Sequence, residues 1–404
     1  MEELIFFAAL LVFAYGLVSA LAGRSPITAP MVFVTVGIAA GPLGLDLMTV
    51  DAGSEIVQVI AEITLILILF TAASTIDLRR LKTEYPIPLR LLAIGLPSMM
   101  VLGIAVAAWM FEGTGFWLIA VMALILSPTD AALAQIVVRS PRIPDAVRDA
   151  ISVESGLNDG IALPPIMACI AAASAPGMLP DLMHWGSYTL SQIALGLLVG
   201  GLIGWAGGYL IDRAAKRRWM EPVYQRLASF ALAVLCYALA EELAGNGFIA
   251  AFFGGLMLGA RTPSVRERIQ EFGEAEGQQL ALFVFLIFGL AMVPMVVDHF
   301  DTTALVYALL SLTLIRMLPV GLSLIGSQLD LRTVGFIGWF GPRGIASILY
   351  TLILIGELGL TGNERILSVI VLTILLSIFA HGISAIPLSS WYARTTRIKK
   401  ERSQ

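Results

Sequence analysis

The residues best suited to chemistry lie in one apolar stretch, AISVESGLNDGIALPPI (150–166), which carries Glu154, Asn158 and Asp159. The stretch predicts the first half of a membrane-spanning helix. A charged side chain at the bilayer centre costs about 2.5–3.5 kcal/mol, and two carboxylates here incur that cost. Asp159 lies about 14 Å along the helix from Ala150, near the middle of a hydrocarbon core about 30 Å thick. An ionisable residue at that depth indicates a functional site.

The side chains of this predicted helix divide between two faces. Asp159 and Ser155 are four residues apart and share a face, whereas Glu154 lies about 100° around the helix from Ser155. Arg316 lies about midway along a later apolar run and needs a carboxylate, because an unpaired buried charge is very costly. Glu154 and Asp159 are both candidates. The spacing allows Asp159 and Ser155 to face a site while Glu154 faces Arg316.

Two apolar runs contain helix-breaking segments, Ser127-Pro128-Thr129-Asp130 and Gly341-Pro342-Arg343-Gly344. Proline removes a backbone donor, and non-helical backbone at membrane depth is tolerated only where it is buried or lines a watery cavity. We expect Asp130 and Arg343 to neutralise the dipoles of the half-helices at these breaks. For Asp130, a water-mediated contact with an ion is an equal alternative. The alternative for both segments is a proline kink in a continuous helix.

The oxygen atoms gathered by these features predict the kind of ligand. The carboxylate of Asp159, the hydroxyl of Ser155 and a freed carbonyl at Thr129 are hard ligands, which suit an alkali cation or a proton. The sequence has no cluster of His and Cys, no nucleophile motif and no phosphate-binding loop. We therefore expect neither an enzyme nor a resident cofactor. His381 stands alone in an apolar run, and we expect it to be a packing residue.

The amino-acid composition indicates the class of protein to which these residues belong. The chain is 58% hydrophobic and 13% charged, against about 25% charged residues in a soluble domain. It predicts an all-α polytopic membrane protein. The net charge of -4, with no basic patch outside the loops, gives no sign of nucleic-acid binding. The N-terminal run (4–22) follows an acidic start, unlike a signal peptide, so we expect it to be a retained helix.

Apolar runs of spanning length predict about thirteen transmembrane helices. They lie at 4–22, 27–44, 55–76, 88–111, 115–138, 150–174, 186–211, 222–243, 247–260, 276–297, 302–326, 335–356 and 365–388. The two breaks fall in the fifth and twelfth helices, which run in opposite directions. This pattern predicts inverted repeats made of helices 1–6 and 8–13, with helix seven as the link and the binding site at the midplane.

Basic residues alternate between the predicted loops and set the orientation. The loops assigned to the inside hold Arg24, Arg79, Arg80, Lys82, Arg139, Arg142, Arg148, Arg213, Lys216, Arg217, Arg218, Arg261, Arg266, Arg268 and Arg332. The loops assigned to the outside are mostly acidic, with Asp46, Asp51, Glu112, Asp181, Asp298, Asp301 and Glu357, and Arg365 is the clear basic exception. We predict an N-terminus outside and a short basic tail (389–404) in the cytoplasm.

With these residues in view, the sequence resembles a known family. ESGLNDGIALP, with SPTDAA upstream and IRMLPV and FGPRGIAS downstream, is similar to the monovalent cation/proton antiporters. It is specifically similar to the NhaP-like electroneutral branch, in which an Asn-Asp pair replaces the Asp-Asp pair of the electrogenic branch. The resemblance covers nearly the whole chain. It implies a homodimer in which a core bundle (88–175 and 302–388) moves against a dimerisation domain (1–80, and 186–298 with the linker helix).

The resemblance also implies a role for each motif residue. It makes Asp159 the shared carrier of cation and proton, with Ser155 and the Thr129 backbone as ligands and Asp130 acting through the hydration shell. Asn158 would be structural or tuning, and Glu154 would pair with Arg316. One departure bears on the choice between sodium and potassium: some archaeal members place a glutamate near the inner end of helix three, where this chain has Ala73 in FTAASTIDL.

These roles predict alternating access, with a proton and a cation competing for one carboxylate. One carrier group implies one-for-one, electroneutral exchange of Na⁺, or of K⁺ or Li⁺, in a plasma (inner) membrane, as expected for pH homeostasis. The alternatives are a cation channel of the same fold, a regulatory membrane protein that has lost transport, and a carrier of organic anions. The single midplane site argues against a channel, and the carboxylates would repel an organic anion.

Overall fold

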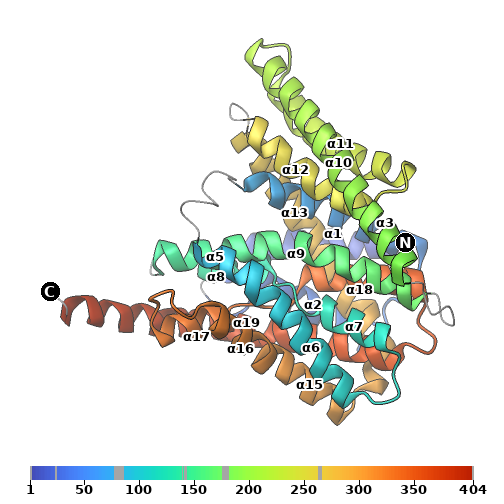
Figure 1. Cartoon of the computed structure of the whole chain (residues 1–404). Coiled ribbons are helices and arrows are strands. Elements are labelled where there is room, and N and C mark those ends of the chain that lie inside the picture. The colour runs from blue at the N-terminus through green and yellow to red at the C-terminus, as the bar shows by residue number, and fades with distance from the viewer. Residues whose placement is uncertain are drawn as a thin grey trace. The chain divides into compact units, whose positions relative to one another are not determined.

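The structure is a computed structural model that describes residues 2–22, 25–76, 86–138, 140, 143–174, 182–262 and 266–402 (Figure 1). Within these residues every regular element is a helix. Several residues of the orientation argument lie outside the described ones: Arg24, Arg79, Arg80, Lys82, Arg139, Arg142 and Asp181.

The described helices include eight that are long and apolar enough to cross a membrane, and five shorter apolar ones. The long ones cover Glu55–Thr75, Pro86–Met110, Asp145–Ala173, Leu190–Lys216, Pro222–Glu242, Ala275–His299, Thr302–Ser323 and Glu364–Thr395. The shorter ones cover Phe6–Ala22, Ala29–Ala40, Phe116–Ile125, Gly247–Arg261 and Ile345–Leu358. Helices suit a bilayer because they satisfy their own backbone hydrogen bonds. The chain is therefore an all-helical multi-pass membrane protein, while thirteen crossings and the inverted repeat stay predictions.

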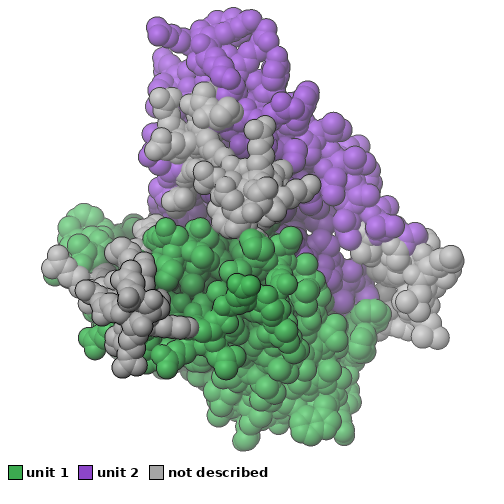
Figure 2. All heavy atoms as spheres, turned by 60° about the vertical axis from the view of Figure 1, so that its left-hand side comes forward, with its two compact units in different colours: residues 1–58, 85–158, 282–404 green, residues 59–84, 159–281 purple. Residues whose placement is uncertain are grey.

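The chain divides into two compact units, coloured in Figure 2. Unit 1 comprises residues 1–58, 85–158 and 282–404. Its elements are α1 (Glu2–Ala22), α2 (Ala29–Ala40), α5 (Pro86–Arg90), η1 (Leu91–Gly95), α6 (Leu96–Met110), α7 (Phe116–Ile125), α8 (Ala131–Val138), the first part of α9 (Asp145–Ala173), η2 (Phe288–Met292), α14 (Val293–Val296), η3 (Val297–His299), α15 (Thr302–Leu312), α16 (Leu314–Ser323), α17 (Leu331–Trp339), α18 (Ile345–Leu358) and α19 (Glu364–Arg402). This unit holds most of the expected core bundle but also residues 1–58 of the expected dimerisation domain. The division into these two domains and their relative motion stay predictions.

Local signals in the sequence set several helix ends in unit 1. Asp301 begins α15 by accepting the N–H of Ala304 at 2.6 Å, and Asp330 begins α17 by accepting the N–H of Thr333 at 2.9 Å. Such side chains satisfy backbone donors that have no partner inside the helix. Gly359 ends α18 with a φ of 72°, a conformation that glycine adopts without strain.

Unit 2 comprises residues 59–84 and 159–281. It holds most of α3 (Glu55–Thr75), the later part of α9, α10 (Leu182–Lys216), α11 (Pro222–Glu242), α12 (Gly247–Arg261) and most of α13 (Arg266–Ile287). α10 and α11 form a hairpin (Figure 1).

Glycines bring the helices of unit 2 into backbone contact. A β-carbon on Gly200 or Gly204 of α10 would lie 2.1 Å from the Ala250 carbonyl oxygen or 2.2 Å from that of Gly254, both on α12. A β-carbon on Gly255 of α12 would lie 2.1 Å from the carbonyl oxygen of Phe70 on α3. Small residues permit such close approach in membrane bundles, so α12 is held between α10 and α3.

Some helix bounds differ from the apolar runs that predicted them. α10 spans Leu182–Lys216 instead of 186–211, and α19 continues through Pro387 to Arg402 instead of ending near 388. A helix can extend past the apolar segment, because polar residues support helix once the chain has left the hydrocarbon. The run predicted at 302–326 is divided at Thr313, where the backbone leaves helical geometry (φ -114°, ψ -89°) and the side chain donates to the Leu309 carbonyl at 2.6 Å.

Candidate functional site

Both predicted helix breaks are non-helical in the structure, and within unit 1 they contact each other. The first break (126–130) separates α7 from α8, and the second break (340–344) separates α17 from α18. The N–H of Asp130 donates to the carbonyl of Pro342 at 2.8 Å. The hydroxyl of Ser347 donates to the carbonyl of Ile125 at 2.8 Å. These contacts supply partners for backbone groups that a helix would otherwise have satisfied.

Asp130 accepts backbone hydrogen bonds from two half-helices. One carboxylate oxygen, Oδ1, accepts the N–H of Leu133 in the first turn of α8 at 3.3 Å. The other, Oδ2, accepts the N–H of Ile345 at the start of α18 at 2.6 Å. A negative charge is stabilised at a helix N-terminus. Here the carboxylate of Asp130 lies at the N-termini of two helices, α8 and α18. The lack of a side chain on Gly344 makes this possible, because a β-carbon there would lie 1.9 Å from Oδ2.

Two buried arginines bind backbone carbonyl groups, one at the end of α17 and one in the second break. Nη1 of Arg343 donates to the carbonyl of Gly341 at 2.8 Å, and Nε of Arg316 donates to the carbonyl of Gly338 at 3.3 Å. Cations are stabilised near a helix C-terminus, where carbonyl groups lack partners. Both guanidinium groups also contact the sulfur of Met99, at 4.0 Å from Arg316 and 3.5 Å from Arg343.

The ion pair expected between Glu154 and Arg316 is present. Nη2 of Arg316 donates to Oε2 of Glu154 at 2.8 Å, and Nη1 donates to Oε1. The two residues are 2% and 0% exposed, so neither charge is solvated and each depends on the other. Two parallel bonds between a guanidinium and a carboxylate fix the geometry as well as the charge. The open choice between Glu154 and Asp159 as the partner of Arg316 is thus decided in favour of Glu154.

A buried polar cluster joins the first break to α9. The side-chain amide of Asn158 donates to the hydroxyl oxygen of Thr129 at 2.6 Å, and the hydroxyls of Thr129 and Ser155 are 3.0 Å apart. All three residues are at most 2% exposed. Sequence reasoning assigned Thr129 a role through its carbonyl and did not foresee the hydroxyl, whose partners depend on how the break faces α9.

Asp159 directly follows Asn158 on α9 and is half-buried. It belongs to unit 2 and stands one helical turn after Ser155, so the two side chains share a face of the helix. Unit 1 brings together the other seven predicted site residues: Thr129, Asp130, Glu154, Ser155, Asn158, Arg316 and Arg343.

Two further residues at this site were missed by sequence reasoning. Ser377 and His381 of α19 contact the two ends of the second break. Their four-residue spacing in an otherwise apolar run was the available signal, since it places both polar groups on one helix face.

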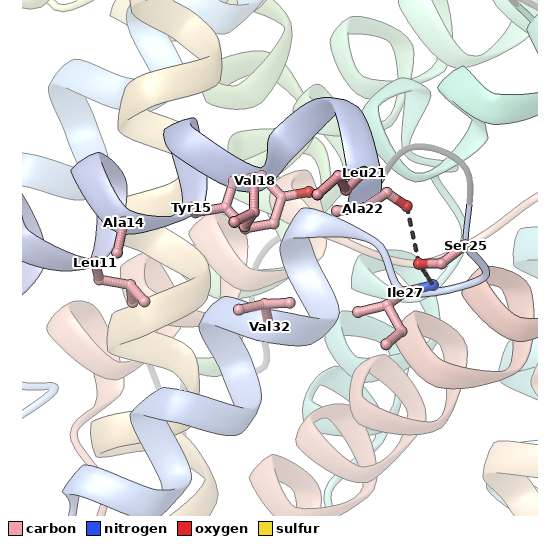
Figure 3. A pocket seen from close by; sticks show the side chains of 9 residues that line it. All are labelled: Leu11, Ala14, Tyr15, Val18, Leu21, Ala22, Ser25, Ile27 and Val32. Carbon is pink, nitrogen blue, oxygen red and sulfur yellow. Dashed lines mark hydrogen bonds between the residues drawn. The ribbon is translucent and has the colours of Figure 1, made fainter.

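A groove of about 490 Å³ lies between α1 and α2, and Figure 3 shows its lining. Its side chains are mostly apolar, with polar groups only on Tyr15 and Ser25. The Ser25 hydroxyl already donates to the carbonyl of Ala22 at 2.9 Å. None of the described residues that line the groove is charged, so the helix breaks remain the candidate site.

Comparison with known proteins identifies the family of this chain. Residues 7–391 match the family of the transmembrane sodium/hydrogen exchanger. A K⁺/H⁺ antiporter NhaP from Alkalimonas amylolytica is 28% identical over 368 residues, which cover 89% of this chain and 62% of the relative. A K⁺/H⁺ antiporter NhaP2 from Shewanella oneidensis is 24% identical, covering 93% of this chain and 64% of the relative. This chain therefore spans about 62–64% of the length of these curated relatives.

Solved structures give the same fold. The sodium proton antiporter MjNhaP1 from Methanocaldococcus jannaschii superimposes with a TM-score of 0.76 at 21% sequence identity, over 94% of this chain and 99% of that one. The family match extends through both helix breaks, the Asn158-Asp159 motif and the Glu154–Arg316 pair. The chain therefore belongs to the transmembrane sodium/hydrogen exchanger family.

Proposed function

We propose that this protein is a secondary antiporter that exchanges a monovalent cation for a proton across a plasma (inner) membrane. The observation that carries the proposal is the buried set of oxygen atoms where the first break meets α9, in a chain of the exchanger family. Hydroxyl, carbonyl and carboxylate oxygens are the ligands that alkali cations prefer. Their gathering in one buried cluster beside a helix break supports a binding site there, since non-helical backbone at membrane depth is tolerated where it is buried or lines a cavity.

In this mechanism Asp159 binds either a proton or a cation, and Ser155 and Thr129 complete the ligand set. Asn158 donates to Thr129 at 2.6 Å and thereby orients its hydroxyl. Both oxygens of Asp130 accept backbone N–H groups, so its contact with the ion runs through water. Glu154, Arg316 and Arg343 hold the breaks in place and carry no ion.

One carrier carboxylate gives one proton for one cation, with no net charge moved. Asn158 stands beside Asp159 where a second carboxylate would allow a second proton. We take Na⁺ as the first candidate substrate, with K⁺ and Li⁺ as alternatives. The relatives are named both ways: Aphanothece halophytica has a Na⁺/H⁺ antiporter that is 25% identical, whereas the Alkalimonas relative is a K⁺/H⁺ antiporter.

We also propose an oligomeric state for the protein and an orientation in the membrane. The protein forms a homodimer, with its N-terminus outside and its C-terminus in the cytoplasm. Alternating access moves the core bundle against the dimerisation helices, and the exchange serves pH homeostasis. Transport of ions, with no bond made or broken, requires neither an enzyme site nor a cofactor.

The test uses purified protein in proteoliposomes that contain a pH-sensitive dye. Gradients of Na⁺, K⁺ or Li⁺ are imposed with and without a clamped membrane potential. Proton flux that one cation drives and that ignores the potential supports one-for-one exchange and names the substrate. Flux that follows the potential means more than one proton per cation, so Asp130 would then be a second carrier. Absence of cation-driven flux at every pH leaves the channel and regulatory alternatives.

The matched variants are Asp159→Asn and Asp330→Asn. Asp330 caps α17 through Oδ1, and asparagine can still accept that bond. We expect Asp159→Asn to abolish exchange and Asp330→Asn to retain it. Exchange that survives in Asp159→Asn would disprove the carrier role.

A further inference from the structure

α19 holds the second break at both of its ends. The N–H of Arg343, inside the break, donates to the hydroxyl oxygen of Ser377 at 2.6 Å. Nε2 of His381 lies 2.9 Å from the carbonyl oxygen of Trp339, the last residue of α17. Ser377 and His381 are 0% and 1% exposed, so no solvent replaces these bonds when they are lost.

His381 faces a carbonyl oxygen on each side of its ring. Nε2 lies 2.9 Å from the carbonyl oxygen of Trp339, and Nδ1 lies 2.9 Å from that of Ser377 and 3.2 Å from the Ser377 hydroxyl. A carbonyl oxygen only accepts, so His381 bonds to Trp339 when Nε2 carries its hydrogen. Through Ser377 and His381, α19 contacts the second break at Arg343 and at Trp339.

The side chain of Trp339 adds further contacts with α19. Its indole stacks on the imidazole of His381, with ring centroids 5.0 Å apart and an angle of 26° between the planes. Its Nε1 donates to the hydroxyl of Ser384 at 2.9 Å. The end of α17 is therefore fixed through both its backbone and its side chain.

We propose that Ser377 and His381 act as a clamp that positions the second break for ion exchange. The clamp holds Trp339 and Arg343 at a fixed separation, so that Gly341 faces Arg316 and Gly344 faces Asp130. Those two close approaches leave no room for a shift, since β-carbons there would lie 2.3 Å from Nε of Arg316 and 1.9 Å from Oδ2 of Asp130. The role of the clamp in ion exchange rests on the proposed antiport. The hydrogen bonds that form the clamp do not depend on that proposal.

Hydrogen–deuterium exchange of the full-length protein in nanodiscs tests the clamp without transport. In the wild type we expect the amides of 340–345 to exchange at least about tenfold more slowly than those of the exposed loop 112–115, although residues 340–344 and 112–115 all lie outside helices. This measurement needs no variant. Equal rates in the two segments, after correction for sequence, would overturn the clamp.

Variants then identify the residues responsible. Ser377→Ala should speed exchange in 340–345 about tenfold, because the buried N–H of Arg343 loses its acceptor. His381→Leu should have an effect of similar size, because the Trp339 carbonyl keeps only the N–H of Gly341 and the contact with α19 is lost. His381→Gln should retain most of the protection, since its amide can donate to the carbonyl of Trp339. The control is Thr373→Val: Thr373 is one turn earlier on α19 and 0% exposed, and its hydroxyl donates at 2.7 Å to its own helix. We expect its exchange to stay within about twofold of the wild type.

Transport by the same variants separates positioning from general stability. The maximal exchange rate should fall about tenfold in Ser377→Ala and His381→Leu, with little change in the cation KM, because neither residue touches the ion. His381→Gln should restore most of the rate. The clamp is wrong if His381→Gln is as impaired as His381→Leu, or if Ser377→Ala leaves exchange in 340–345 unchanged. If the wild type shows the protected break but no antiport, the clamp stands and the proposed function fails.

Discussion

Arg316 lies against Gly341, and its guanidinium occupies the space that a side chain on Gly341 would fill. A β-carbon there would lie 2.3 Å from Nε and 2.6 Å from Cζ of Arg316. The second break thus leaves a gap for the arginine that pairs with Glu154. The glycine of the break and the ion pair between α9 and α16 are therefore parts of one packing arrangement.

Gly341→Ala should push the guanidinium of Arg316 away from Glu154. Because breaking a buried ion pair costs about 3–5 kcal/mol, we expect a loss of that order in the free energy of unfolding, measured by denaturant titration in mixed micelles. Gly335→Ala on α17 is the control, since nothing lies within 4 Å of its added β-carbon. Equal stability of the two variants would contradict the packing arrangement.

Removing one partner of the Glu154–Arg316 pair should be worse than removing both. Glu154→Gln leaves a buried guanidinium without its counter-charge and should cost about 3–5 kcal/mol, whereas Glu154→Gln with Arg316→Met should recover part of that loss. The exposed pair of Arg365 and Asp301, at 3.9 Å, gives the comparison. Arg365→Gln should change stability by less than about 1 kcal/mol. A double variant no more stable than Glu154→Gln would argue against pairing as the cause.

Asp130→Asn should separate capping from ion carriage. Asparagine offers one acceptor oxygen, but Asp130 accepts from both Leu133 and Ile345. One backbone N–H would face an amide donor, and we expect a loss of about 1–3 kcal/mol in the free energy of unfolding. Antiport by the remaining folded protein should stay one-for-one. Unchanged stability with an altered number of protons per cation would instead make Asp130 a carrier.

Neighbouring glycines of α10 should respond oppositely to alanine. A β-carbon on Gly200 would lie 2.1 Å from the carbonyl oxygen of Ala250, whereas nothing lies within 4 Å of one on Gly201. Gly200→Ala should force α10 and α12 apart and cost about 1–3 kcal/mol. Gly201→Ala should be neutral or stabilising by up to about 1 kcal/mol, because alanine favours helix. Thermal unfolding of the two variants side by side measures the difference, and equal midpoints would refute the backbone contact.

Local features of the chain predicted much of this architecture. Long apolar runs indicate membrane helices, because a bilayer requires each span to be apolar and to satisfy its own backbone. Pro128 and Pro342 marked the breaks for an equally local reason, since proline cannot continue the hydrogen-bond ladder. The length of α19 was less predictable, because helix continues past the apolar residues that signal a span.

The sequence by itself determined the class of protein, the place of both helix breaks and the short set of ionisable residues at membrane depth. Only the tertiary structure decided their partners: Glu154 for Arg316, 162 positions away, two half-helices for Asp130, and the second break for His381, which had looked like a packing residue. The physical reason is that apolar length and proline act on neighbouring residues, whereas a buried polar group bonds to whichever distant helix packs against it.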